Sequence, residues 1–134
     1  MYDPKSLICL IDDDNICNTV NKLLIKKRFD HEVEVCSFVY PEEGLDYLKR
    51  SFSEKKYNKV LILLDINMPV MNGWEFLEEF KNIDIKETDV NITILSSSLH
   101  KDDIEKAEND PLVSEFVTKP LNTTPLQKLH EWMN

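Results

Sequence analysis

Five short apolar runs, each separated from the next by a segment of helical periodicity, constrain the fold of this chain most strongly. The runs are nearly continuous, as in strands that are buried on both faces of a parallel sheet. The second run differs, because Val33 and Val35 alternate with glutamates at its start, and we expect it to be a half-exposed edge strand. The five runs cover residues 7–11, 33–39, 60–64, 90–95 and 113–117.

The intervening segments predict five helices. The first follows Asp14 as its N-cap and places Ile16, Val20, Leu23 and Leu24 on one apolar face. The others begin at Pro41, near Gly73, near Lys101 and at the Thr123-Thr124-Pro125 segment. Strict alternation of strands and helices predicts a three-layer α/β sandwich around a parallel sheet, formed by one domain over residues 1–134.

Composition excludes several classes of function. The chain has only two glycines, so it contains neither a G-x-G-x-x-G fingerprint nor a glycine-rich Walker loop. A net charge of -9 disfavours direct nucleic-acid binding. There is no apolar stretch of membrane-spanning length and no signal-peptide core near Met1. The cysteines Cys9, Cys17 and Cys36 are odd in number and lack C-x-x-C spacing, which indicates core residues in a reducing compartment. We therefore expect a cytoplasmic protein without membrane insertion.

Reactive polar groups follow four of the predicted strands. Asp12-Asp13-Asp14 follows the first, Asp65 the third, Ser96 the fourth and Lys119 the fifth. In parallel α/β sheets the ligand crevice lies outside the carboxyl ends of the strands. Carboxylates gathered there would repel one another, and a hard, oxygen-binding cation such as Mg²⁺ would compensate them. Lys119 and a serine hydroxyl would then face phosphoryl oxygens.

These segments together carry a family resemblance. The resemblance rests on Leu10-Ile11-Asp12-Asp13-Asp14, on Leu63-Leu64-Asp65-Ile66-Asn67-Met68-Pro69 with Gly73, on Ile94-Leu95-Ser96-Ser97, and on Thr118-Lys119-Pro120. The chain resembles the response-regulator receiver domains of two-component signalling. This resemblance implies a flavodoxin-like (βα)5 fold with strand order 2-1-3-4-5, here without an output domain.

The resemblance also implies a role for each site residue. Asp65 corresponds to the phosphoacceptor. Asp13 and Asp65 would bind Mg²⁺ directly, the backbone carbonyl of Asn67 would be a third ligand, and Asp12 would hold the ion through water. Lys119 would neutralise the phosphoryl oxygens, and the Lys119-Pro120 bond would be cis.

A conformational switch is implied as well. Ser96 would move towards the phosphoryl group, and Phe116, which stands at the switch aromatic without a tyrosine hydroxyl, would respond. The fourth helix, fifth strand and fifth helix would then form the output face. The implied donor is a phosphohistidine on a sensor kinase or phosphotransfer protein, and the signal would leave through an unknown downstream partner or a phosphorylation-dependent dimer. The domain would be no enzyme beyond catalysing its own phosphorylation and dephosphorylation.

Two other interpretations remain open at this point. A Mg²⁺-dependent phosphatase resembling the haloacid-dehalogenase family would use Asp12 as nucleophile, with Asp14 completing a D-x-D motif. That interpretation leaves Asp65 without a task. A receiver fold that is never phosphorylated and only binds partners is the other alternative.

Overall fold

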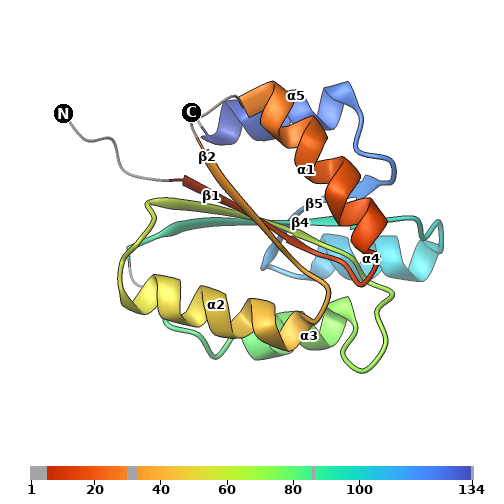
Figure 1. Ribbon diagram of the computed structural model, residues 1–134. Coiled ribbons are helices and arrows are strands. Elements are labelled where there is room, and N and C mark those ends of the chain that lie inside the picture. The colour runs from red at the N-terminus through yellow and green to blue at the C-terminus, as the bar shows by residue number, and fades with distance from the viewer. Residues whose placement is uncertain (1–5, 30–32, 86, 134) are drawn as a thin grey trace.

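A computed structural model of the chain describes residues 6–29, 33–85 and 87–133, and in this part five strands alternate with five helices (Figure 1). Residues 1–5, on which the prediction of no signal peptide partly depends, lie outside it. The strands are β1 (Ser6–Ile11), β2 (Val33–Phe38), β3 (Lys59–Leu64), β4 (Asp89–Ser96) and β5 (Val113–Thr118). The helices are α1 (Asn15–Phe29), α2 (Pro41–Ser53), α3 (Gly73–Phe80), α4 (Lys101–Asn109) and α5 (Thr123–Met133).

All strand pairs are parallel, and the sheet order is β2-β1-β3-β4-β5, which confirms the predicted topology. Helices α1 and α5 cover one face of the sheet, and α2, α3 and α4 cover the other (Figure 1). The predicted three-layer sandwich is therefore confirmed. None of the described helices combines the length and the apolarity needed to cross a bilayer.

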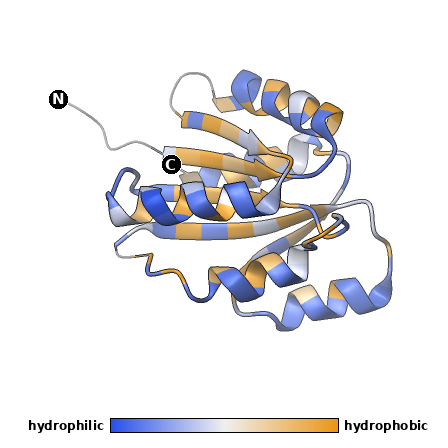
Figure 2. Ribbon diagram, turned by 60° about the horizontal axis from the view of Figure 1, so that its bottom comes forward, coloured by the Kyte–Doolittle hydropathy of each residue, from blue (hydrophilic) through white to orange (hydrophobic). Residues whose placement is uncertain are grey.

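The apolar runs form the core because alternate side chains of each strand point to opposite faces. In β1, Ile8 and Leu10 pack beneath α1 and α5, whereas Leu7, Cys9 and Ile11 pack beneath α2 and α3. The strands are mainly hydrophobic along their length, while the helices mix hydrophobic and hydrophilic residues (Figure 2). As predicted for an edge strand, every residue of β2 is only half-buried.

The predicted core face of α1 is wrong. Ile16, Val20 and Leu23 are 77%, 49% and 65% exposed, and of the four residues only Leu24 packs partly against the core. Asn18 is turned inwards instead, because its side-chain amide donates a hydrogen bond of 2.8 Å to the backbone carbonyl of Asp12. Asn18 shares this inward face with Ile25 and Phe29, which are buried in the core, so the helix buries a different face from the predicted one.

Candidate functional site

The acidic side chains predicted at the strand ends come together in the structure. Asp12 and Asp13 follow β1, and Asp65 follows the neighbouring β3, whose end is joined to β1 by a hydrogen bond of 2.9 Å from the Asp65 N–H to the Ile11 carbonyl. Each of the three carboxylates offers one oxygen within 4.8 Å of the others. Three carboxylate oxygens at this spacing fit a hard divalent cation such as Mg²⁺.

Lys119 reaches the same cluster from β5. Its Nζ donates a hydrogen bond of 2.6 Å to Oδ2 of Asp12 and lies 3.7 Å from Oδ1 of Asp65. The backbone N–H of Lys119 donates to the carbonyl of Ser96 at 2.8 Å, which joins the end of β5 to the end of β4. The Lys119-Pro120 bond is cis, as the resemblance implied.

The Asp65 carboxyl is electrostatically unusual. Burial, together with the negative charges of Asp12 and Asp13, raises its pKa to about 6, although Lys119 opposes this shift. For Lys119, burial alone would lower the pKa, but the hydrogen bond to Asp12 and the charges of Asp65 and Asp12 outweigh burial and raise it. The site therefore holds a half-buried ammonium beside two buried carboxylates, and the negative charges of the acids destabilise one another.

A tight loop after β3 presents Asp65. The N–H of Gly73 donates to the carbonyl of Ile66 at 2.8 Å, and a Cβ on Gly73 would lie only 2.6 Å from the backbone oxygen of Asp65. Only glycine fits this close approach. The side chain of Asn72 accepts a hydrogen bond from the Glu75 N–H and so caps α3. Asn67, within the loop, is exposed.

Asp14 is not part of the acidic cluster, and its side chain has a different role. Its Oδ1 accepts hydrogen bonds from the N–H groups of Ile16 and Cys17, at 3.0 and 3.2 Å. The predicted N-cap of α1 is therefore confirmed. Asp14 is also not among the three acids whose oxygens lie within 4.8 Å of one another, so the D-x-D interpretation lacks its second acid in this cluster.

Ser96 and Phe116, the two residues of the predicted switch, lie on β4 and β5. Ser96, the last residue of β4, is fully buried, and its hydroxyl accepts a hydrogen bond of 3.1 Å from the Ser98 N–H. Phe116 in β5 is paired in register with Ile94, is half-buried and packs against the small cluster under α4 that contains Ala107. Two hollows of about 320 and 540 Å³ both include Phe116 in their lining.

Two residues near the site were missed by the sequence interpretation. Asn18 supports the Asp12 backbone, and the Cys17 thiol interacts with both Asp12 and Lys119. Burial and the Asp12 charge raise the pKa of this thiol, against the effect of Lys119. Both residues lie in the first turns after the Asp14 cap, so their proximity to the strand end could have been predicted from helix geometry.

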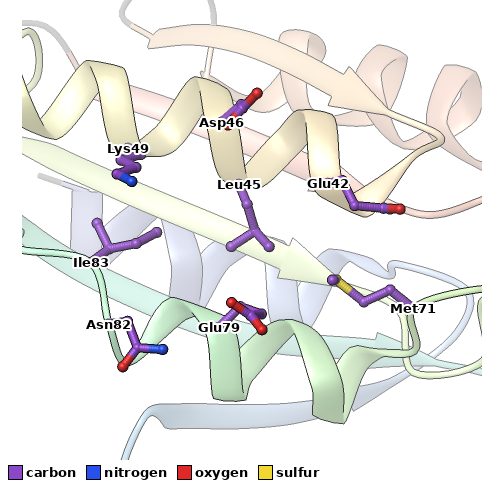
Figure 3. A pocket seen from close by; sticks show the side chains of 8 residues that line it. All are labelled: Glu42, Leu45, Asp46, Lys49, Met71, Glu79, Asn82 and Ile83. Carbon is purple, nitrogen blue, oxygen red and sulfur yellow. The ribbon is translucent and has the colours of Figure 1, made fainter.

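Of two further hollows, only one includes a residue of the acidic cluster in its lining. One of about 580 Å³ opens beside Asp13 and is also lined by Tyr40 and Val70. The other, of about 300 Å³, lies between α2 and α3, with an apolar floor that includes Leu45 and a rim of charged side chains that includes Glu79 (Figure 3). The hollow beside Asp13 is thus the one that adjoins the acidic cluster.

Comparisons with known proteins agree with this geometry. The chain matches the response regulator receiver domain family over residues 8–131. It is 33% identical over 122 residues to the regulatory protein VanRB of Enterococcus faecalis, covering 91% of this chain but only 49% of that protein. It is 29% identical over 133 residues to the response regulator Rcp1 of Synechocystis, covering 95% of this chain and 85% of that protein.

Solved structures show the same relationship. A two-component response regulator from Cytophaga hutchinsonii has a TM-score of 0.81 at 31% identity, with 98% of this chain and 97% of that chain covered. A response regulator receiver protein from Dyadobacter fermentans has a TM-score of 0.82 at 25% identity, with 96% and 98% covered. The chain, with its acidic strand ends and its lysine directly after β5, therefore belongs to the response regulator receiver domain family.

Proposed function

We propose that the chain accepts a phosphoryl group on Asp65 from a phosphohistidine of a sensor kinase or phosphotransfer protein, as one step of a phosphorelay. The observation that carries this proposal is the position of Asp65, buried beside Asp12 and Asp13 and within 3.7 Å of the Lys119 ammonium. A buried carboxylate in such a site is costly for folding and is typical of a functional group.

In the proposed reaction an oxygen of the Asp65 carboxylate attacks the phosphorus atom. A phosphorus–oxygen bond forms, the phosphorus–nitrogen bond of the donor breaks, and the imidazole nitrogen keeps the electron pair. With a pKa of about 6, Asp65 is largely ionised at neutral pH and can act as the nucleophile. Lys119, now bound to Asp12, is close enough to turn towards the phosphoryl oxygens and to neutralise part of their charge.

The acidic cluster supports Mg²⁺ as the cofactor. Asp13 and Asp65 would hold the ion directly, with the backbone carbonyl of Asn67 as a third ligand and Asp12 acting through water. When bound, Mg²⁺ would supply positive charge against the phosphoryl oxygens. The protein itself supplies the nucleophile, its orientation and the positive charge of Lys119.

Exposed apolar side chains support a protein as the phosphoryl donor. Large hydrophobic residues lie uncovered on α1 and on the loops that follow β2, β3 and β4. Large exposed apolar residues are candidate contact points for another protein. They are Ile16, Val20, Leu23, Tyr40, Val70 and Leu99.

The signal would leave through α4, β5 and α5. In our proposal the Ser96 hydroxyl leaves the Ser98 N–H for a phosphoryl oxygen, and Phe116 repacks in the space that this movement opens. The hollows beside Phe116 support such repacking, because they leave room next to the ring. The altered face would bind a downstream protein or a second copy of the chain. The domain would work in the cytoplasm and would be no enzyme beyond its own phosphorylation and dephosphorylation.

Labelling with a small phosphodonor tests this proposal. The protein is incubated with Mg²⁺ and the donor, and the intact mass should increase by one phosphoryl group that is stable to acid and labile to hydroxylamine. The Asp65→Asn variant should remain unlabelled. A phosphoryl group on Asp12 would instead support the phosphatase interpretation. No label from any competent small or protein donor would favour the pure interaction module.

A further inference from the structure

Two thiols lie side by side on neighbouring strands, away from the proposed phosphoryl site. The register of β1 and β2 pairs Cys9 directly with Cys36. Both side chains belong to the core cluster beneath α2 and α3, so they leave the sheet on the same face. Cys9 is fully buried, Cys36 is half-buried, and neither is in a disulfide.

The spacing of adjacent strands permits a bond between these sulfurs. Neighbouring strands lie about 4.7–4.9 Å apart, which falls within the Cα separation of about 4.4–6.8 Å found in disulfides. The Cβ atoms of a disulfide lie about 3.5–4.5 Å apart, so the strands would have to approach by a few tenths of an ångström. Because β2 is at the edge of the sheet, it can move towards β1 without breaking a second ladder. The resulting bond would be strained and readily reduced.

The two thiols differ in reactivity. The interaction with Cys9 lowers the pKa of Cys36, with help from Lys22 and Lys56 and against the effects of burial and Glu34. The interaction with Cys36, together with complete burial, holds the pKa of Cys9 well above its usual range. A half-buried thiol of lowered pKa beside a second thiol is the arrangement found in reversible redox sites.

We propose that Cys9 and Cys36 form a reversible oxidation site, which closes to a cross-strand disulfide when it reacts with a small-molecule disulfide. The Cys36 thiolate attacks one sulfur of the oxidant, forms a mixed disulfide and releases the first thiol. Cys9 then attacks the Cys36 sulfur, its proton passes to the departing thiolate, and the second thiol is released. The protein loses two hydrogens, and the oxidant is reduced to two thiols.

The position of this pair links it to the acidic cluster. Cys9 is three residues before Asp12, and the Asp12 N–H donates a hydrogen bond of 3.1 Å to the carbonyl of Phe38 at the end of β2. Drawing β2 towards β1 therefore shifts the strand end that carries Asp12. Resting on the proposed function, we expect the oxidised form to accept a phosphoryl group on Asp65 roughly tenfold more slowly, since small displacements of aligned groups have effects of this size.

Treatment of the folded chain with oxidised glutathione tests the oxidation site. The wild type should lose two hydrogens by intact mass, give a Cys9–Cys36 linked peptide and recover on addition of excess thiol. Cys17→Ser should behave in the same way, Cys36→Ser should form no disulfide, and Cys9→Ala should stop at a mixed disulfide on Cys36. If Cys9→Ala does not fold, the wild-type time course gives the order instead, with the Cys36 adduct appearing first. Adducts confined to Cys17, or no Cys9–Cys36 peptide, would overturn the proposal.

Two measurements separate this inference from the proposed function. Backbone amide NMR signals of Asp12 and Asp13 should shift on oxidation, and unchanged signals would overturn the coupling without any phosphodonor. Rates of Asp65 labelling should differ between the reduced and oxidised forms, and equal rates would also overturn the coupling. If the reduced protein is never labelled, the proposed function fails, while the mass and NMR measurements still decide the oxidation site and its coupling.

Discussion

The ammonium of Lys119 is hydrogen-bonded to Asp12 at 2.6 Å and stands 3.7 Å from Asp65. Lys119 is therefore held by the neighbour of the proposed nucleophile rather than by the nucleophile itself. The ammonium thus holds the Asp65 carboxylate less closely than it holds Asp12, which suits a group that has to attack an incoming phosphorus atom. The same arrangement makes Lys119 the main counter-charge of the two buried carboxylates, Asp12 and Asp65.

Lys119→Ala should lower the free energy of unfolding by about 2 kcal/mol in the absence of divalent ions, because it leaves buried carboxylates without a counter-charge. Chemical denaturation in the presence of a chelator measures this change. Lys128→Ala is the matched control. Lys128 pairs with Glu115 at 2.8 Å on the exposed surface, where solvent screens the pair, and its loss should change stability little. Equal losses in the two variants would contradict the burial argument.

Asp65→Asn should stabilise the metal-free protein at neutral pH by about 2 kcal/mol, since the folded state raises the pKa of this carboxyl from 3.8 to about 6. The full change in pKa corresponds to roughly 3 kcal/mol, and solvent that reaches the carboxyl screens part of it. The folded state disfavours the ionised form, so the destabilisation by wild-type Asp65 is complete above the folded pKa and disappears below the unfolded one. The advantage of the variant should therefore shrink as the pH falls from about 6 to about 4. Asp46→Asn, which removes an exposed carboxylate on α2, is the control and should show little effect. A difference between wild type and Asp65→Asn that does not vary with pH would refute the assignment.

Gly73→Ala should be strongly destabilising, by roughly 2–3 kcal/mol, because the new Cβ would lie 2.6 Å from the backbone oxygen of Asp65 and 2.9 Å from Cα of Ile66. Gly44→Ala tests the same substitution where the nearest atom, at 2.9 Å, is the end of the Ile11 side chain. A side-chain terminus can move and backbone cannot, so Gly44→Ala should have a much smaller effect. Thermal denaturation of both variants measures the difference, and equal effects would show that the β3–α3 loop also adapts.

Mg²⁺ should raise the free energy of unfolding of the wild type, by an amount that grows with its concentration and reaches about 2.7 kcal/mol at one hundred times the dissociation constant. Asp13→Asn should remove most of this stabilisation, because Asp13 belongs to the acidic cluster. Asp14→Asn should leave it intact, since that carboxylate caps α1 and asparagine caps as well. A thermal-shift titration with Mg²⁺ measures this stabilisation in the wild type and in both variants. Loss of the Mg²⁺ effect in Asp14→Asn would favour the D-x-D interpretation.

Ile16→Ser and Leu23→Ser should each slow phosphoryl transfer from a phosphohistidine protein roughly five- to tenfold, because they remove exposed apolar contacts of the size found at interfaces. Folding should be nearly unaffected, since these side chains are 77% and 65% exposed. Labelling by a small phosphodonor should not change. Lys49→Ser, on the exposed surface of α2, is the control. If transfer from the protein donor also stays unchanged, α1 is not the docking face.

Much of the fold could be predicted from local patterns. Continuous apolar runs followed by polar residues predicted all five strands to within a residue or two, and Asp14, Pro41 and Gly73 marked the starts of helices. Two buried aromatic residues of α3, Phe76 and Phe80, were not among the predicted core residues. The approximate place of each element was therefore readable, because strand and helix periodicity are properties of neighbouring residues.

The inward face of α1 could not be read in this way. An amphipathic pattern predicts burial of Ile16 and Val20, but the hydrogen bond from Asn18 to the Asp12 carbonyl orients the helix differently. Such a bond depends on how the helix lies across the end of β1. The exposed apolar residues of α1 are therefore a consequence of tertiary packing.

The sequence by itself determined which chemical groups stand at the strand ends, because each of them lies within two residues of the end of an apolar run, and the family motifs named the same residues. Only the tertiary structure decided their contacts: the Lys119 ammonium on Asp12, the Cys17 thiol beside both, and Cys9 opposite Cys36. Those contacts join residues as far apart in the chain as 12 and 119, so they depend on strand order and register, which local periodicity does not encode.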